Sequence, residues 1–223
     1  MTLPALLKAD LKFLWRYGFG ALYALFTALY VLLLSALPES VRGTACTLLI
    51  FSDPAVMGLF FMGALLLLER SQRVLPAIAV SPAAPWEYAL SKALSLTLVG
   101  TAVGGVLAVV GGGGKLLYTL CAVLLGALFF SLMGLVAAFY SGSLNQFLML
   151  SVAAELLLCV PGVLLVFGWL PRWLSWHPGA LVVAGMGGDA LALLLLLPWC
   201  GAAFWLAERT AKRKLVDLGG VKL

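Results

Sequence analysis

Long apolar runs separated by short polar stretches dominate the chain. Six of these runs approach the roughly 20 residues that a helix needs to cross about 30 Å of hydrocarbon. The runs are continuous and do not alternate, which favours helices over the strands of a membrane barrel. The pattern therefore predicts an all-α polytopic membrane protein. Its six transmembrane helices are expected at about residues 18–37, 47–68, 93–110, 116–139, 147–169 and 189–206.

Two further segments are apolar but do not read as spans. In residues 3–16, Lys8, Lys12 and Arg16 recur every four positions and form one stripe on a helix. This predicts an amphipathic helix lying in the membrane surface, and the alternative is a charged start to the first span. Residues 170–188 are too short and too broken to cross the bilayer. They predict short re-entrant helices before the last span.

The composition fits a membrane protein better than a soluble one. Of the 223 residues, 64% are hydrophobic and 10% charged. Soluble domains are about half apolar and about a quarter charged. Six spans and their loops use up the chain, so we expect one transmembrane domain over residues 1–223. We expect the first apolar run to be retained as a span and not removed as a signal peptide.

The net charge of +5 is carried by residues at the predicted membrane edges. Such residues meet anionic lipid, and the chain has no long basic arm, so nucleic acid is not an expected partner. With both termini in the cytoplasm, 11 of the 14 Lys and Arg residues fall inside and three, Arg42, Lys115 and Arg172, fall outside. This asymmetry follows the positive-inside rule and predicts a multi-pass inner (plasma) membrane protein with cytoplasmic ends. The 11 inner cations are Lys8, Lys12, Arg16, Arg70, Arg73, Lys92, Arg209, Lys212, Arg213, Lys214 and Lys222.

Motifs for catalysis and metal binding are missing from the sequence. His177 is the one histidine, so HExxH is absent and a Ser-His-Asp triad could use only this residue. A structural role for His177 in its loop is the favoured interpretation. The scattered cysteines predict neither a disulfide framework nor a zinc site. Without a phosphate-binding loop, the chain is not expected to hydrolyse ATP or to hold a cofactor or metal itself.

Three acids lie within or at the ends of the predicted spans: Asp53, Glu155 and Asp189. Placing an ionised group at the centre of a membrane helix costs about 2.5 kcal/mol or more, so each is a candidate for the substrate path. Each has a structural alternative. Asp53, before Pro54, could cap or kink its helix, and Asp189, after glycines, could be an N-cap. Glu155 lies about 12 Å along its predicted span, where it needs a protein-lined cavity or a structural hydrogen bond.

The longest polar segment between spans covers residues 69–92. It carries five charges and three prolines. Because Pro82 and Pro85 interrupt any long helix, residues 83–91 are predicted to form a short amphipathic helix parallel to the membrane. Such a helix could transmit a conformational change from a soluble partner to the spans. The alternative is that the segment is an ordinary loop.

This segment, within residues 65–96, resembles the signature region of type-2 ABC transporter permeases. In that family the second span ends in a Glu-rich turn, and a Ser-Pro pair, a Glu-Tyr pair and a Lys follow before the third span. The matching residues here are Glu69, Ser81, Pro82, Glu87, Tyr88 and Lys92. The runs FLWRYGFGALYALFTALYVLLL and FSDPAVMGLFFMGALLLLER are similar, more narrowly, to the permease subunits named as fluoroquinolone exporters. Ser71 and Gln72 depart from the usual glycine-containing turn, which leaves the local turn geometry open.

The resemblance covers essentially the whole chain and implies a permease subunit of an ATP-driven ABC exporter. Such a subunit moves an amphipathic small molecule, drug or lipid out of the cell through a permease dimer interface. It implies two partners, a second permease copy or sister chain and a cytoplasmic ATP-binding subunit that holds ATP and Mg²⁺. It also implies that residues 3–16 form an interface helix and residues 83–90 a coupling helix. The coupling residues that it implies are Glu69, Arg70, Ser81, Pro82, Trp86, Glu87, Tyr88 and Lys92.

Two rival classes of function remain. One is a non-pumping membrane assembly or immunity protein that binds lipid or peptide. The other is an intramembrane enzyme, which the missing acid/base constellations disfavour. Co-purification with an ATP-binding subunit would separate the exporter from the first rival.

Overall fold

The computed structural model describes residues 2–112 and 115–218, and within them every regular element is a helix. Residues 113 and 114 of the glycine run, and Lys222 among the predicted inner cations, lie outside the described residues. Six helical segments are long and apolar enough to cross a membrane. The prediction of an all-α polytopic protein with six spans is therefore confirmed.

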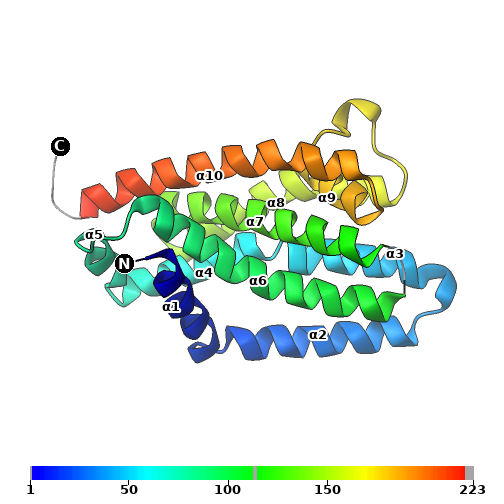
Figure 1. The fold of residues 1–223 in the computed structure, drawn as a ribbon, viewed down its shortest axis with the longest axis horizontal. Helices are drawn as coiled ribbons and strands as arrows, with labels where there is room; N and C mark the ends of the chain where they lie inside the picture. Colours follow the sequence, from blue (N-terminus) through cyan, green and yellow to red (C-terminus); the bar gives the residue numbers. More distant parts are fainter. Residues whose placement is uncertain (1, 113–114, 219–223) are drawn as a thin grey trace.

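The six spans follow the chain in order, and their helices lie side by side (Figure 1). They are α2 (Phe19–Ala36), α3 (Glu39–Ile50) continuing through a π-helix into α4 (Gly58–Ser71), α6 (Pro85–Gly111), α7 (Leu116–Tyr140), α8 (Leu144–Val166) and α10 (Ala190–Leu218). The shorter helices α1 (Leu3–Arg16) and α5 (Val74–Ala79) lie at the same end of the bundle as the last turns of α10, and α5 packs against α10. We call this the terminal end. The other end carries the turn from α2 to α3 and the loop before the last span.

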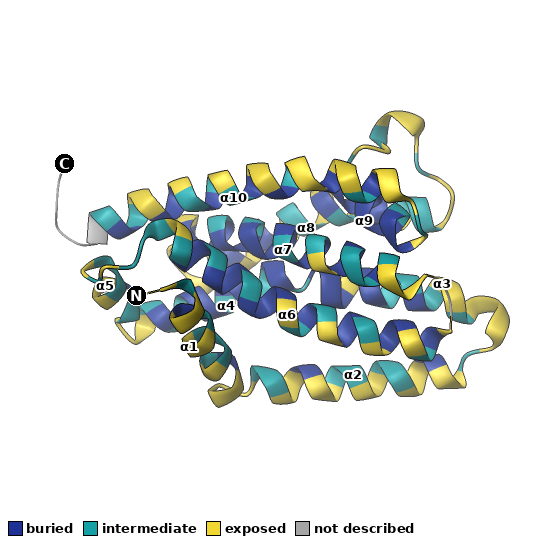
Figure 2. Cartoon of the chain, in the orientation of Figure 1, coloured by how far each residue is buried: buried dark blue, intermediate teal, exposed yellow. Residues whose placement is uncertain are grey.

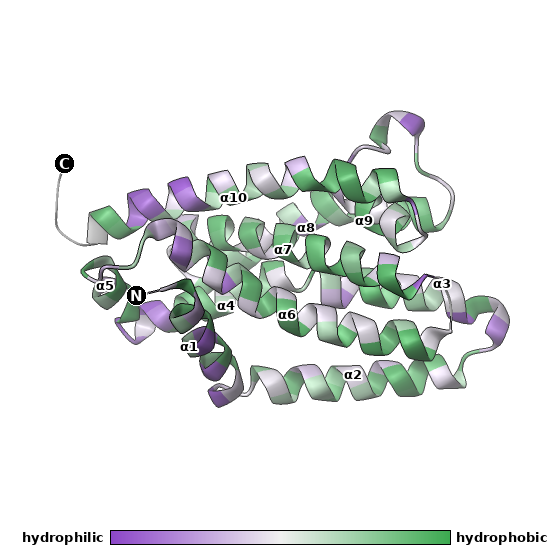
Figure 3. Ribbon diagram, in the orientation of Figure 1, coloured by the Kyte–Doolittle hydropathy of each residue, from purple (hydrophilic) through white to green (hydrophobic). Residues whose placement is uncertain are grey.

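Burial and hydropathy are distributed as a membrane bundle requires. Helix α7 packs against α4, α6 and α10 and is largely buried, whereas α2 and α8 expose most of their residues (Figure 2). Hydrophilic residues gather towards the two ends, with an apolar band between them (Figure 3). Because exposed apolar side chains on α2, α8 and α10 are costly in water, this band fits a hydrocarbon environment.

Several helices extend beyond the predicted spans. Their end turns are polar, and a span prediction from hydropathy includes only the apolar part of a helix. The clearest case is α6, which begins at Pro85. Proline is tolerated in a first helical turn, where its missing N–H has no partner to lose. The Glu87 carboxylate accepts a hydrogen bond from the Ala84 backbone N–H at 2.9 Å and caps this start.

The prediction of a separate short helix at residues 83–91 is therefore wrong, because residues 85–91 form the first turns of α6. A short helix does occur in the polar segment, but it is α5. Arg73 precedes α5 with a positive φ of 57°. A non-glycine residue in this left-handed region is uncommon and marks a tight reversal of the chain after α4.

The second span is broken by the π-helix η1 (Phe51–Ala55), which contains Asp53 and Pro54. Proline cannot donate a backbone hydrogen bond, and π-bulges of this kind are rare and often functional. Helix α6 packs directly behind the break. A Cβ atom built on Gly100 would lie 2.4 Å from the Pro54 carbonyl oxygen, so only glycine permits this contact. The break is thus a fixed part of the packing.

Short helices precede the last span, as residues 170–188 predict. They are η2 (Arg172–Leu174) and α9 (Pro178–Met186), and α9 packs against α7, α8 and α10. His177 is the N-cap of α9: its Nδ1 accepts the Gly179 N–H at 3.4 Å. Burial lowers the pKa of His177, which favours the neutral ring that can accept this hydrogen bond.

The α8–α9 contact is a backbone contact. A Cβ atom on Gly179 would lie 2.1 Å from the Leu158 carbonyl oxygen, and one on Gly162 would lie 2.7 Å from the Gly179 oxygen. Small residues of this kind allow helix backbones to approach closely in membrane proteins.

Candidate functional site

A buried lysine holds three helices together at the terminal end. Lys92, near the start of α6, is 3% exposed. Its Nζ lies 2.5 Å from Oδ1 of Asp10 on α1 and also pairs with Oε1 of Glu69 on α4. One ammonium group is therefore shared by carboxylates from two other helices.

The remaining polar atoms of this network are also paired. The Tyr88 hydroxyl donates to Oε2 of Glu69 at 2.9 Å, and Ser91 donates to Oδ2 of Asp10. The Lys92 ammonium also lies over the rings of Phe13 and Tyr88, 5.7 and 5.6 Å from their centroids. Buried charges are tolerated when they are both paired and hydrogen-bonded. We call these residues, Asp10, Glu69, Tyr88, Ser91 and Lys92, the Lys92 network.

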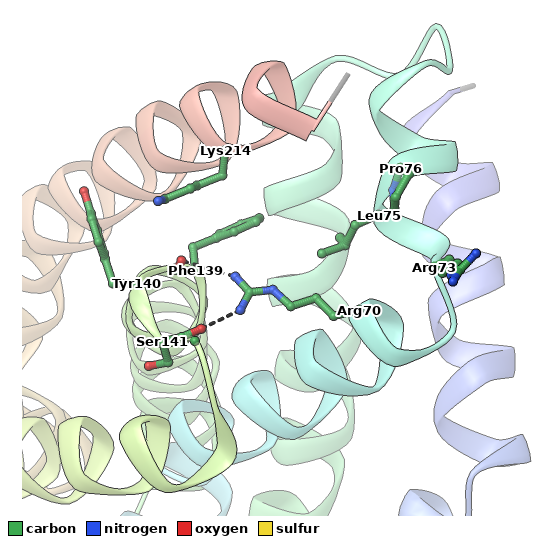
Figure 4. A pocket seen from close by; sticks show the side chains of 9 residues that line it. Arg70, Arg73, Leu75, Pro76, Phe139, Tyr140, Ser141 and Lys214 are labelled. Atoms are coloured by element: carbon green, nitrogen blue, oxygen red, sulfur yellow. Dashed lines mark hydrogen bonds between the residues drawn. The ribbon is translucent and has the colours of Figure 1, made fainter. Parts of the chain in front are cut away.

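Arg70, the residue after Glu69, reaches a different part of the bundle. Its guanidinium donates to the carbonyl oxygens of Ser141 at 2.5 Å and Phe139 at 3.2 Å (Figure 4). These carbonyls end α7, where backbone acceptors lack helical partners. At the end of α4, Glu69 therefore connects this helix to α6 and, through Lys92, to α1. The next residue, Arg70, connects α4 to the end of α7 and the α7–α8 turn.

The eight predicted coupling residues divide between interior and surface. Glu69, Tyr88 and Lys92 are buried within the Lys92 network, and Arg70 is half-buried. Ser81, Pro82, Trp86 and Glu87 lie in the connection from α5 to α6 or in the first turn of α6. Pro82 and Trp86 are exposed there. The residues of the α5–α6 connection and the first turn of α6 can therefore contact a partner directly. The buried residues can affect a partner only by changing the positions of their helices.

Asp53 is the one candidate acid that is buried. It is 3% exposed, and neither carboxylate oxygen has a hydrogen-bond partner among the described residues. Tyr30 of α2 lies close enough for its hydroxyl to interact with the Asp53 side chain, and Tyr23 of the same helix also lies near it. A buried polar group without a partner is unusual in a folded protein and calls for an explanation in function.

The other two candidate acids have different surroundings. Asp189 is the N-cap of α10, since its Oδ1 accepts the backbone N–H groups of Leu191 at 2.9 Å and Ala192 at 3.3 Å. Glu155 is half-buried on α8 between the exposed Val152 and Leu156. In the described part of the chain, no hydrogen bond or ion pair joins any two of the three acids. The structure therefore does not assemble them into one polar cluster.

Sequence reasoning missed Asp10. A signal was present, because Asp10 lies four residues from both Leu6 and Leu14, the two buried residues of α1. An acid on the buried face of an amphipathic helix needs a cationic partner. No group of three or more metal-ligating side chains occurs in residues 2–112 and 115–218.

The similarity to known proteins covers most of the chain. A family model for the fluoroquinolones export permease protein family matches residues 1–199. Two relatives named fluoroquinolones export permease proteins come from Mycobacterium tuberculosis strains CDC 1551 / Oshkosh and ATCC 25618 / H37Rv. Each is 26% identical to this chain over 204 residues, which covers 89% of this chain and 82% of the relative. No solved structure matches the chain.

Proposed function

The chain belongs to the fluoroquinolones export permease protein family, and we propose that it is the membrane-spanning permease subunit of an ATP-driven ABC exporter. The observation that carries this proposal is the family match over residues 1–199, which includes the Lys92 network and Asp53. The proposed cargo is an amphipathic small molecule or drug, with fluoroquinolones as the first compounds to test. We place the protein in the plasma membrane as one permease domain, with the terminal end facing the cytoplasm.

The energy for transport would come from a separate cytoplasmic ATP-binding subunit that holds ATP and Mg²⁺. The surface available for its docking lies between α5 and α6, where Val80 is 77% and Trp86 41% exposed. A partner can shift a conformational equilibrium only if it contacts the two states differently. A displacement of this surface would reach the spans through Tyr88 and Lys92, since both are on α6 and both contact Glu69 on α4.

The proposed substrate path is centred on Asp53. An unpaired carboxylate in an apolar interior attracts a cationic group, because Coulomb interactions are strong where water is excluded. Protonated amines on amphipathic drugs supply such a group, and aromatic rings beside the carboxylate add cation–π attraction. Glu155 is a second candidate on this path. Asp189 is used to cap α10, and its proposed role there is structural.

A permease dimer would account for the position of Glu155. This carboxylate sits on α8 beside the exposed Leu156 and Leu157, where a single chain would leave it at the lipid boundary. Acids in membrane helices almost always face protein or a water-filled cavity. A second copy or a sister permease packed along α8 would provide that protein surface.

The test of coupling uses the exposed residues of the α5–α6 connection. Deleting residues 83–90 would also remove buried Tyr88, so the sharper variant is Val80→Asp combined with Trp86→Ala. In proteoliposomes that contain the ATP-binding subunit, we expect this variant to lose ATP-dependent efflux of a fluorescent fluoroquinolone. The matched control is Val41→Asp with Trp169→Ala, because Val41 is 47% and Trp169 73% exposed and both lie at the opposite end.

Undiminished efflux by the Val80 and Trp86 variant would refute this docking surface. Purification in mild detergent without any ATP-binding subunit would instead favour the non-pumping lipid- or peptide-binding protein.

A further inference from the structure

A cavity lies at the terminal end, beside Arg70. It has a volume of about 450 Å³ and lies between the end of α4, the start of α5, the α7–α8 turn and α10 (Figure 4). This volume is in the range of small-molecule binding sites. We call it the basic pocket. Its lining residues are Arg70, Arg73, Leu75, Pro76, Phe139, Tyr140, Ser141, Gly142 and Lys214.

The charge of the basic pocket is one-sided. Three of the nine described lining residues are cations, Arg70, Arg73 and Lys214, and none is an acid. The Arg70 hydrogen bonds to carbonyl oxygens leave its positive charge in place, and Lys214 lies 5.6 Å from the centroid of the Tyr140 ring. This contrasts with the Lys92 network, where two carboxylates pair with one cation. The basic pocket therefore favours an anion.

The position of the pocket indicates where that anion comes from. Helix α4 ends at Ser71 and α7 ends at Tyr140, so two apolar spans terminate at the pocket. Phospholipid phosphates lie at this level in a bilayer, just outside the hydrocarbon. The walls match an amphipathic ligand, because Leu75 and Phe139 are apolar while the cations supply hydrogen-bond donors. Basic pockets between membrane helices are known sites for anionic head groups.

We propose that the basic pocket binds the phosphate group of an anionic phospholipid. Arg70 and Lys214 lie among the other lining side chains, whereas Arg73 lies at the edge of the pocket with its guanidinium pointing outward (Figure 4). Arginine suits this ligand, because its planar donors fit phosphate oxygens and its charge is permanent. A lipid bound here would contact α4, α5, α7 and α10 at once and fix the terminal end against the membrane surface.

The test compares lipid binding by charge-matched variants of the full-length protein. The pocket variant is Arg73→Gln with Lys214→Gln. The control is Arg16→Gln with Arg213→Gln, two exposed cations outside the pocket. Arg70 is kept, because it caps α7. Affinity for phosphatidylglycerol and for phosphatidylcholine is measured on purified protein by native mass spectrometry.

We expect the wild-type protein to prefer phosphatidylglycerol, and the pocket variant to lose about 25-fold in that affinity. This takes about fivefold for each cation that pairs with the bound phosphate, the upper end for partly exposed ion pairs. The control variant is expected to keep wild-type affinity. Equal losses in the two variants would indicate general surface charge and overturn the proposal.

Two further outcomes would also overturn it. If inorganic phosphate displaces phosphatidylglycerol completely at millimolar concentration, the site takes free phosphate and not a lipid. If the pocket variant binds lipid normally but no longer co-purifies with an ATP-binding subunit, the pocket receives an acidic protein surface. A lower affinity of the Lys214→Gln variant for phosphatidylglycerol, together with a wild-type melting temperature, would support the lipid site.

Discussion

Two buried carboxylates on the same span show opposite solutions to the same electrostatic problem. Glu69 and Asp53 are both 3% exposed and both belong to the helical segment Glu39–Ser71. Glu69 is paired with Lys92 and hydrogen-bonded by Tyr88. Asp53 lies at a π-helical break and has no hydrogen-bond partner among the described residues.

The difference separates a charge that holds the fold from one that is available to a ligand. Charges in a low-dielectric interior are stable only with partners. Glu69 has all of its partners within the chain, so its contribution is to structure. Asp53 leaves its interaction capacity unused, and such strained or unsatisfied groups tend to occur at functional sites. We therefore propose that the middle of the span serves the substrate path and that its terminal end connects the helices mechanically.

The largest expected effect on stability is at Lys92, the cation that pairs with Glu69. Lys92→Met should leave the buried Glu69 and the largely buried Asp10 close together and without their cation. Removing one partner of a buried pair costs about 3–5 kcal/mol. We therefore expect the melting temperature in detergent to fall by at least about 6 °C. Lys12→Met, on the exposed face of α1, is the control and should melt like the wild type. A normal melting temperature for Lys92→Met would mean that the Lys92 network does not stabilise the fold.

A smaller effect is expected at Glu69. Glu69→Gln keeps the size of the side chain and an acceptor for Tyr88, and Lys92 keeps its pair with Asp10. The variant should lose about 1.5–3 kcal/mol, the contribution of a hydrogen bond to a charged group. Thermal melting beside Lys92→Met measures this, and the double variant tests their coupling. Additive losses would contradict a shared network, because residues in one network are expected to couple.

The smallest effect on stability is expected at Asp53. Asp53→Asn replaces a buried acid whose carboxylate oxygens accept no hydrogen bond from the described residues, so the melting temperature should stay the same or rise. Efflux of cationic drugs should fall while efflux of neutral ones is retained, measured in the same proteoliposomes. Glu155→Gln tests the second path candidate in the same assay. A clear drop in melting temperature for Asp53→Asn, with unchanged efflux, would reverse the comparison and make Asp53 structural.

The sequence was sufficient for the spans because hydropathy is a local property. Each predicted apolar run lies in a helix of the structure, and the broken segment before the last span forms short helices. The helix ends were less predictable. Pro85 looked like an interruption, but it occupies the first turn of α6, a position that proline favours. Proline marks a helix boundary without stating which side of it is helical.

The candidate site was predicted only in part, because its contacts join distant parts of the chain. Glu69, Tyr88 and Lys92 were named from the resemblance, but their pairing was not. Asp10 is far from Lys92 in the sequence, and no local pattern specifies that the two meet. Arg70 similarly reaches carbonyl oxygens at the end of α7, and backbone acceptors leave no mark in a sequence.

The glycine contact between α8 and α9 limits where the bundle can open. With a carbonyl oxygen occupying the space of each missing side chain, neither helix can rotate or slide without a backbone collision. Packed backbones of this kind are stiff, since interiors have low compressibility. The segment formed by α8, η2 and α9 should therefore move as one rigid body. Any opening of the bundle during transport is then expected between other pairs of helices.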